Sequence, residues 1–148
     1  MNMHRLLLAA LAVAGSLLPV VAAAQSKPLT TAFFEENRVR PRDAARLRAT
    51  IFNRTISIRT LKDGAIEQVH YGATRVDGRG KKTKYAIRDG GIEEQHGGVP
   101  RMLLIYDWHG HAYGCLEDVG DLDELGEAKG TCPFEIVATA TDSHRGGK

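Results

Sequence analysis

TISIRTLKDGAIEQVHYGATRVDGRGKKTKYAIRDG, residues 55–90, alternates apolar and polar residues between three Asp-Gly dipeptides. Such alternation places apolar side chains on one face of a strand. Asp-Gly between two alternating segments is a strong signal for a β-hairpin, because type I′ turns need positive φ at both central positions. We therefore expect type I′ turns at Asp63-Gly64, Asp77-Gly78 and Asp89-Gly90, and consecutive antiparallel strands between them.

Similar segments continue toward the C-terminus. MLLIYD (102–107) and FEIVATA (134–140) are strand-like, and a further turn is expected at His109-Gly110. The fold class is therefore predicted to be mainly β, an antiparallel meander of about six or seven strands in residues 50–140. Whether the meander closes into a small barrel or curls around an N-terminal helix stays open. The alternation assigns these residues to the inward face: Ile56, Ile58, Tyr85, Ile87, Leu103, Ile105, Cys132, Phe134 and Ile136.

Residues 25–49 have a helical rather than a strand pattern. Thr30 or Thr31 can cap a first helix, and Pro41 followed by Asp43 can start a second one. We expect one or two short helices before the sheet. Residues 141–148 are polar and Gly-rich and are expected to form a flexible tail.

Residues 1–24 have the features of an export signal. A single early arginine precedes an apolar run, and Ala22-Ala23-Ala24 supplies the small residues that signal peptidase requires. The competing interpretation is an uncleaved membrane anchor, because the apolar run approaches the roughly 20 residues that span a bilayer. Pro19 disfavours a spanning helix. The sequence thus predicts a bacterial protein that is periplasmic or secreted, with no transmembrane segment after signal removal.

Cys115 and Cys132 are the two cysteines of the chain. An even pair in a small exported protein predicts a disulfide, which would contribute about 3 kcal/mol in the chain-entropy model. A redox pair would normally be Cys-x-x-Cys, so free or metal-bound thiols are the weaker alternative.

The stretch WHGHAYGC, residues 108–115, raises the question of a metal site. His109 and His111 would share one face of a regular strand, where two imidazoles could bind Zn²⁺ or Cu²⁺. Gly110 between them favours a turn, which would splay the two side chains. No further ligands stand at a recognised spacing. We therefore predict a disulfide-tethered hairpin, with no metal, no cofactor and no catalytic residue assigned.

The residues Trp108, Gly110, Cys115 and Cys132 also carry a resemblance. A Trp that closes one strand, a Gly turn, a Cys on the returning strand and a second Cys before a final strand resemble small exported bacterial β-rich domains of unknown function. The resemblance covers residues 48–139 and implies only a secreted β-rich fold. The long acidic insertion between the cysteines departs from that pattern.

Known catalytic motifs are absent from the sequence. It holds no G-x-S-x-G, no P-loop, no H-E-x-x-H and no C-x-x-C. The acidic stretch 116–130 was the remaining candidate for a calcium loop, but an EF-hand starting at Asp121 would have Leu125 and Cys132 at two ligand positions. An EF-hand is therefore excluded, and a solvated loop is expected.

Charge is distributed unevenly along the chain. Residues 38–88 hold fourteen Lys or Arg and four acids, whereas residues 89–142 hold two bases and twelve acids. One interpretation is that the halves interleave in the sheet and neutralise each other across strands. The other is that a basic face survives and binds an anionic partner. The candidate residues for such anion binding are Arg79, Lys81, Lys82 and Lys84.

These observations favour a non-catalytic periplasmic or secreted binding module. Its partner would be an anionic envelope component or an acidic protein, with nucleic acid disfavoured by the compartment. Two alternatives stay open. One is a small-ligand carrier with an apolar barrel lumen, and the other is a minor hydrolytic enzyme that uses His109 or His111 beside a carboxylate such as Asp107, Glu93 or Glu94.

Overall fold

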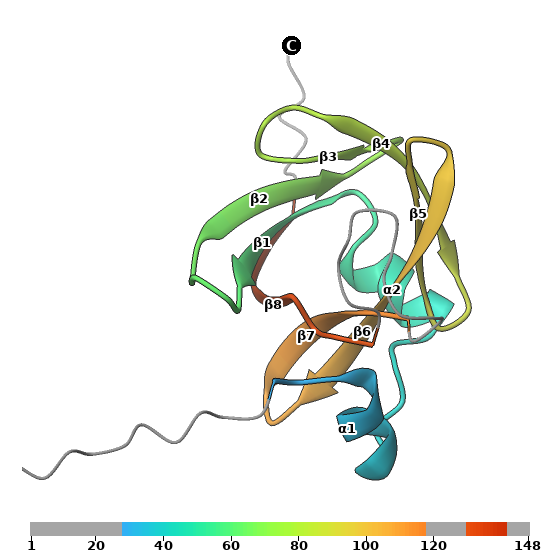
Figure 1. Ribbon diagram of the computed structural model, residues 1–148. Coiled ribbons are helices and arrows are strands. Elements are labelled where there is room, and N and C mark those ends of the chain that lie inside the picture. Colours follow the sequence, from blue (N-terminus) through green and yellow to red (C-terminus); the bar gives the residue numbers. More distant parts are fainter. Residues whose placement is uncertain (1–27, 118–129, 142–148) are drawn as a thin grey trace, which may run out of the picture.

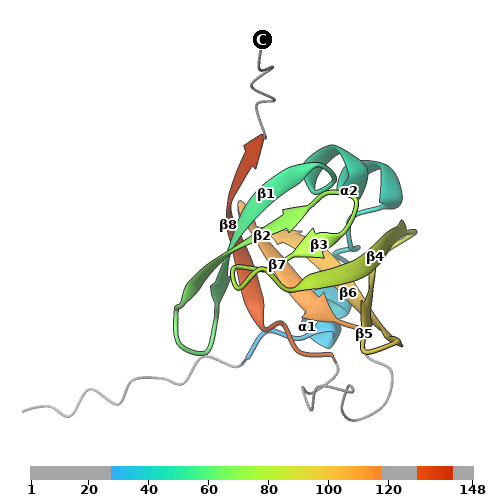
Figure 2. The ribbon, with the colours of Figure 1, turned by 90° about the horizontal axis from the view of Figure 1, so that it is seen from above.

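The computed structural model describes residues 28–117 and 130–141, which form a closed antiparallel β-barrel with two short helices (Figure 1 and Figure 2). The predicted leader, most of the acidic stretch and nearly all of the predicted tail lie outside the described residues. The elements are α1 (Thr31–Glu36), α2 (Ala44–Thr50), β1 (Arg54–Thr60), β2 (Ile66–Tyr71), β3 (Arg75–Val76), β4 (Lys82–Arg88), β5 (Gly91–His96), β6 (Val99–Trp108), β7 (His111–Leu116) and β8 (Phe134–Thr141).

Each strand pairs with the next one in sequence, and β1 pairs with β8 to close the barrel. The meander predicted from the alternating segments is therefore confirmed, with eight strands rather than six or seven. The additional strand is β3, which has two residues and is too short to show alternation in the sequence. Closure settles the question that the sequence left open.

Hairpins are present at the three Asp-Gly pairs, as predicted, but none of the three is a type I′ turn. None of the three aspartates has a positive φ. In the loops 61–65 and 77–81 the aspartate side chain instead accepts amide hydrogen bonds: Asp63 Oδ1 from Ala65 at 2.9 Å, and Asp77 Oδ1 from Arg79 at 3.0 Å. Aspartate thus builds the turn through its side chain.

The turn at His109-Gly110 is as predicted. Both residues have positive φ, at 48° and 80°, and they connect the paired residues Trp108 and His111. This is the backbone that a two-residue type I′ hairpin needs. The stretch WHGHAYGC is therefore the hairpin between β6 and β7.

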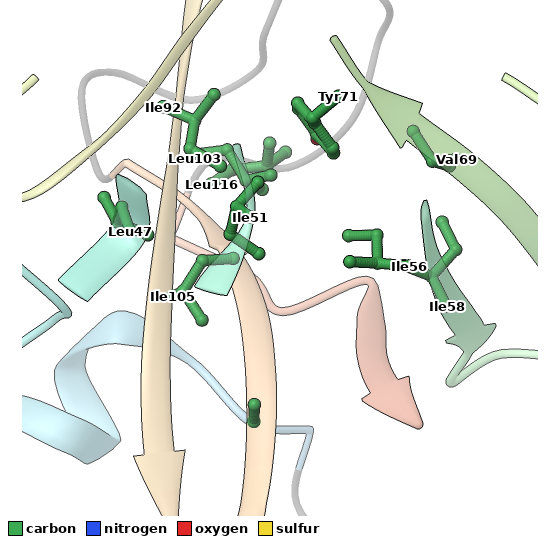
Figure 3. Close-up of a cluster of buried hydrophobic side chains, with 11 residues drawn as sticks. Leu47, Ile51, Ile56, Ile58, Val69, Tyr71, Ile92, Leu103, Ile105 and Leu116 are labelled. Carbon is green, nitrogen blue, oxygen red and sulfur yellow. The ribbon is translucent and has the colours of Figure 1, made fainter. Parts of the chain in front are cut away.

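The barrel interior is filled by apolar side chains from the strands and from α2 (Figure 3). Ile56 and Ile105 are 2% and 1% exposed, and Leu47 and Ile51 at the end of α2 reach into the same cluster with no exposed surface. Burying a side chain of this size stabilises the fold by roughly 1.5–3 kcal/mol. Helix α2 therefore completes the core of the barrel. Eight of the nine residues predicted to face inward belong to this cluster: Ile56, Ile58, Tyr85, Ile87, Leu103, Ile105, Phe134 and Ile136.

The ninth residue, Cys132, lies elsewhere. It forms a disulfide with Cys115, as predicted, and both belong to a second cluster outside the barrel with Phe34 and Tyr106. The rings of Phe34 on α1 and Tyr106 on β6 stack with centroids 4.4 Å apart. Cys132 precedes β8, so strand alternation does not determine where it points.

Both helices begin at capping residues from the predicted helical segment. The hydroxyl of Thr30 accepts from the amide of Phe33 at 3.2 Å, and the carboxylate of Asp43 accepts from the amide of Arg46 at 2.8 Å. Arg42, immediately before the second cap, makes two hydrogen bonds to Asp107 on β6, at 2.9 and 2.6 Å. These contacts fix α2 over the barrel.

Candidate functional site

The four predicted cations Arg79, Lys81, Lys82 and Lys84 lie together on the loop between β3 and β4 and on the first half of β4. All four are exposed. Lys82 and Lys84 flank Thr83, whose side chain is buried, so both lysines point away from the barrel interior. We call these four residues the basic hairpin.

Two carboxylates hold the backbone of the basic hairpin in place. Asp77 Oδ1 accepts from the amides of Arg79 and Lys81 at 3.0 and 2.9 Å, and Glu67 Oε1 accepts from the amide of Gly78 at 2.9 Å. The hydrogen bond from the backbone of Lys81 is the main reason why the pKa of Asp77 lies below its ordinary value. Both carboxylates therefore bond to backbone amides, which fixes the loop from which the cations project.

The basic first half and the acidic second half of the sequence do pair across the fold. Within residues 28–117 and 130–141, ion pairs join arginines of the basic half to carboxylates of the acidic half. They are Arg42–Asp107 at 2.6 Å, Arg46–Asp107 at 3.1 Å, Arg59–Glu135 at 3.6 Å, Arg75–Glu94 at 3.2 Å and Arg88–Glu93 at 3.4 Å. The interleaving interpretation thus holds for these arginines.

The side chains of the basic hairpin are not neutralised by these ion pairs. Within residues 28–117 and 130–141, none of its four side chains takes part in an ion pair. The two glutamates of the neighbouring strand β5 form ion pairs with other arginines, Glu93 with Arg88 and Glu94 with Arg75. Cross-strand pairing thus neutralises part of the basic half, whereas the four cations of the basic hairpin stay exposed and without an ion pair among the described residues.

An exposed apolar residue lies next to the basic hairpin. Ile66, at the start of β2, is 62% exposed, and it lines the same hollow of about 650 Å³ as Arg79. Glu67, Gln68, Asp77 and Gly78 complete this lining. Cationic and apolar groups therefore share one surface.

Sequence reasoning missed a buried polar cluster inside the barrel. Glu94 on β5 is 1% exposed, and its carboxylate lies 2.8 Å from the Tyr71 hydroxyl, 3.0 Å from Nε2 of His96, 3.2 Å from Nε of Arg75 and 3.9 Å from a terminal guanidinium nitrogen of Arg101. The groups come from β2, β3, β5 and β6. They link four strands at one place.

The cluster keeps its carboxylate ionised. Burial alone raises the pKa of Glu94, but the hydrogen bond from His96 and the charge of Arg75 outweigh it, so that the pKa lies below its ordinary value. Burial, followed by the charge of Glu94, raises the pKa of Tyr71 well above 10. The contacts of Glu94 with groups from β2, β3 and β6 therefore link these strands to β5.

The histidines of WHGHAYGC occupy separate places. The ring of His109 lies edge-on to Trp108, with centroids 4.4 Å apart. Nδ1 of His111 lies 2.5 Å from Oε1 of Glu135, whose other oxygen is 3.6 Å from Arg59. The turn thus splays the two imidazoles, as predicted. His111 meets Glu135 rather than the carboxylates considered for a hydrolytic site.

Two further features of the described residues bear on the site. No group of three or more His, Cys, Asp or Glu that could hold a metal occurs among them. Neither described helix has the length and apolar character needed to cross a membrane. Most of the acidic stretch that the sequence analysis tested for a calcium loop, residues 118–129, lies outside the described residues.

Comparisons with known proteins give no family for the chain. No protein-family model, no curated protein and no solved structure matches it.

Proposed function

We propose that the chain is a non-catalytic binding module of the bacterial periplasm or exterior, and that the basic hairpin binds an anionic lipid surface of the envelope. The observation that carries this proposal is the display of Arg79, Lys81, Lys82 and Lys84. Four exposed cations project from a loop whose backbone is fixed, and within the described residues none of them has an ionic partner.

The compartment supports an envelope partner. The disulfide between Cys115 and Cys132 is compatible with an oxidising compartment outside the cytoplasm. The leader expected in residues 1–24 would direct the chain there. Anionic lipid headgroups and lipopolysaccharide phosphates are abundant charged surfaces in that compartment, so they match the sign and the exposure of the hairpin.

The filled barrel favours binding on the outer surface rather than in a lumen. Ile56, Leu103, Ile105 and Leu116 occupy the interior at 1–2% exposure, and α2 adds Leu47 to them. A carrier of the kind considered above would need open apolar space among these side chains.

Charge arithmetic sets the expected strength. Each cation near an anionic membrane contributes about 1 kcal/mol, and salt screens this contribution over about 8 Å at physiological ionic strength. Asp77 and Glu67 lie beside the four cations and offset part of their attraction. Ile66 can add apolar contact with the headgroup region. The binding should therefore be weak to moderate and should decrease as salt increases.

Vesicle co-sedimentation tests the proposal. The mature chain is mixed with vesicles of phosphatidylglycerol and phosphatidylethanolamine at low and high salt. The triple variant Lys81→Gln, Lys82→Gln, Lys84→Gln should bind at least about tenfold more weakly than the wild type at low salt. A matched variant, Arg38→Gln, Arg40→Gln, Lys62→Gln, has the same net charge but changes exposed cations elsewhere, and it should bind nearly as the wild type does.

The outcome has three readings. Loss confined to the hairpin variant supports the proposal. Equal loss in both triple variants shows that overall charge, rather than the hairpin, attracts the vesicle. If wild type and hairpin variant bind equally poorly at low salt, the proposed function is wrong.

A further inference from the structure

Strands β3 and β4 pair over only two residues each. β4 pairs with β5 along the whole of Lys84–Arg88, but its pairing with β3 is limited to Lys82 and Thr83. β3 ends there, and β4 continues past it (Figure 2). One edge of the second half of β4 therefore lies beside no strand of the barrel.

Alternation along β4 shows which backbone groups face this edge. The amide of Asp77 donates to the carbonyl of Lys81, so residues 81 and 83 face β3. In an antiparallel ladder the same side is faced by every second residue, hence by Tyr85 and Ile87. No backbone hydrogen bond to Tyr85 or Ile87 from that side is present in the described part of the chain.

A cleft of about 280 Å³ lies along this edge. Its lining consists of Arg48, Phe52, Gly72, Ala73, Tyr85, Ala86 and Ile87. The Tyr85 hydroxyl donates to the carbonyl of Gly72 at 2.6 Å. This side-chain hydrogen bond connects β4 to the segment between β2 and β3. The side chain of Phe52 is 45% exposed and gives the cleft an accessible aromatic surface. The cleft thus combines a strand edge that has no backbone partner among the described residues with a mainly apolar lining, and α2 packs beside β4 at its rim.

The charges around the cleft have one sign. Arg48 is the charged residue of the lining, it is exposed, and it makes no ion pair with any described residue. Lys84 precedes Tyr85 on the strand and is likewise exposed. The lining includes no carboxylate. An occupant with acidic groups would complement these cations.

We propose that this edge binds an extended acidic peptide segment of a partner protein by strand addition to β4. The peptide backbone pairs with the amide and carbonyl groups of Tyr85 and Ile87. One of its apolar side chains packs against Phe52 in the cleft, and an acidic side chain two positions away, on the same face of the added strand, faces Arg48. Strand addition of this kind takes affinity from main-chain hydrogen bonds and specificity from pockets for alternate side chains.

The size of the cleft favours a peptide over a small molecule. Pockets for drug-sized ligands usually enclose about 300–1,000 Å³. A cleft of about 280 Å³ has room for one or two side chains, and a small ligand would leave the backbone groups of Tyr85 and Ile87 unused. Unpaired strand edges are also the places where proteins commonly acquire a further strand.

The test uses a pool of synthetic heptapeptides, acetylated and amidated at their ends, that place Asp or Glu two positions away from Val, Ile or Phe. Binding to the ¹⁵N-labelled mature chain is followed by amide chemical shifts and by hydrogen exchange. Shifts should centre on residues 85–87, and the amides of Tyr85 and Ile87 should gain protection from exchange. If peptides bind elsewhere, or if nothing binds at about 1 mM, the proposal is wrong.

Charge reversal supplies the controls. Arg48→Glu should weaken the best acidic peptide at least about tenfold and should instead favour its Lys-substituted counterpart. Lys62→Glu makes the same change on an exposed residue outside the cleft lining and should leave the affinity unchanged. Phe52→Ala should also weaken binding, whereas Ile66→Ala should not. Equal effects of Arg48→Glu and Lys62→Glu would overturn the proposal.

The peptide site and the lipid-binding hairpin can fail separately. The double variant Lys81→Gln, Lys82→Gln keeps Lys84 beside the cleft, so the amides of Tyr85 and Ile87 should still gain protection from exchange in this variant when peptide is added. Loss of peptide binding in that variant, with the cleft variants unaffected, would assign the peptide to the hairpin instead and contradict strand addition.

Discussion

Nε of Arg75 on β3 and Oε1 of Glu94 on β5 form an ion pair of 3.2 Å. Their two strands are not neighbours in the barrel, since β4 lies between them. The pair therefore crosses the inside of the barrel and ties the two-residue strand β3 to β5. Asp77, which organises the basic hairpin, follows Arg75 by two positions. The buried charge thus helps to hold the loop that displays the exposed charges.

Removing the charge of Glu94 should destabilise the fold strongly. Glu94→Gln leaves the guanidiniums of Arg75 and Arg101, which are 14% and 11% exposed, without their carboxylate. Breaking a buried ion pair at one partner costs about 3–5 kcal/mol. Urea unfolding of the purified variant measures this loss. Glu93→Gln on the same strand, which breaks an exposed pair with Arg88, should cost about 1 kcal/mol or less.

The same glutamate should make stability depend on pH in the acidic range. The pKa of Glu94 is lower in the folded chain than its ordinary value. The contribution of ionised Glu94 to the free energy of unfolding is therefore complete above its pKa in the unfolded chain, which is about 4.3. This contribution is lost as the pH falls through the lower pKa of the folded chain. The free energies of unfolding of wild type and Glu94→Gln should converge as the pH falls below about 4.3. A gap that widens as the pH falls would contradict this assignment.

The sequence was sufficient to predict the strands and most of the inward residues, because both depend on a local period of two. The same period also places Glu94 inside, since it shares the parity of Ile92, which is fully buried. The partners Arg75 and Arg101 could not be found in this way, because closure of the barrel brings together strands that are distant in the sequence.

The basic hairpin could be predicted for a different reason. Its location depends on a turn signal and on the cost of burying several lysines without partners. Which cations would remain without an ion pair depended on the register of β4 against β5. That register directs Glu93 outward, where it reaches Arg88, and Glu94 inward, where it reaches Arg75. Composition alone could not distinguish between the two halves neutralising each other and a surviving basic face.

Loss of the disulfide should lower stability substantially. Cys115 and Cys132 are 0% and 6% exposed and are separated by 17 positions. A bridge that closes a loop of this length contributes about 2–5 kcal/mol, so the double variant Cys115→Ala, Cys132→Ala should unfold at correspondingly lower denaturant. Wild type unfolded in reducing buffer serves as the comparison. Two reactive thiols in denatured, non-reduced exported protein would show that the bridge does not form.

A single methyl group at position 114 should test the packing where β7 pairs with β8. A Cβ added at Gly114 would lie 2.2 and 2.3 Å from Cε2 and Cζ of Phe134, which is the residue paired with it on β8. Gly114→Ala must therefore displace the phenylalanine ring, and overpacking of this kind costs about 1–3 kcal/mol.

The double variant Gly114→Ala, Phe134→Leu isolates this contact. A smaller side chain at position 134 relieves the clash, so the two substitutions together should cost less than the sum of their separate costs, with a coupling of about 0.5–3 kcal/mol. Denaturant unfolding of both single variants and the double variant gives this coupling directly. Additive costs would mean that the ring of Phe134 does not cover Gly114, and the register between β7 and β8 would then need to be reassigned.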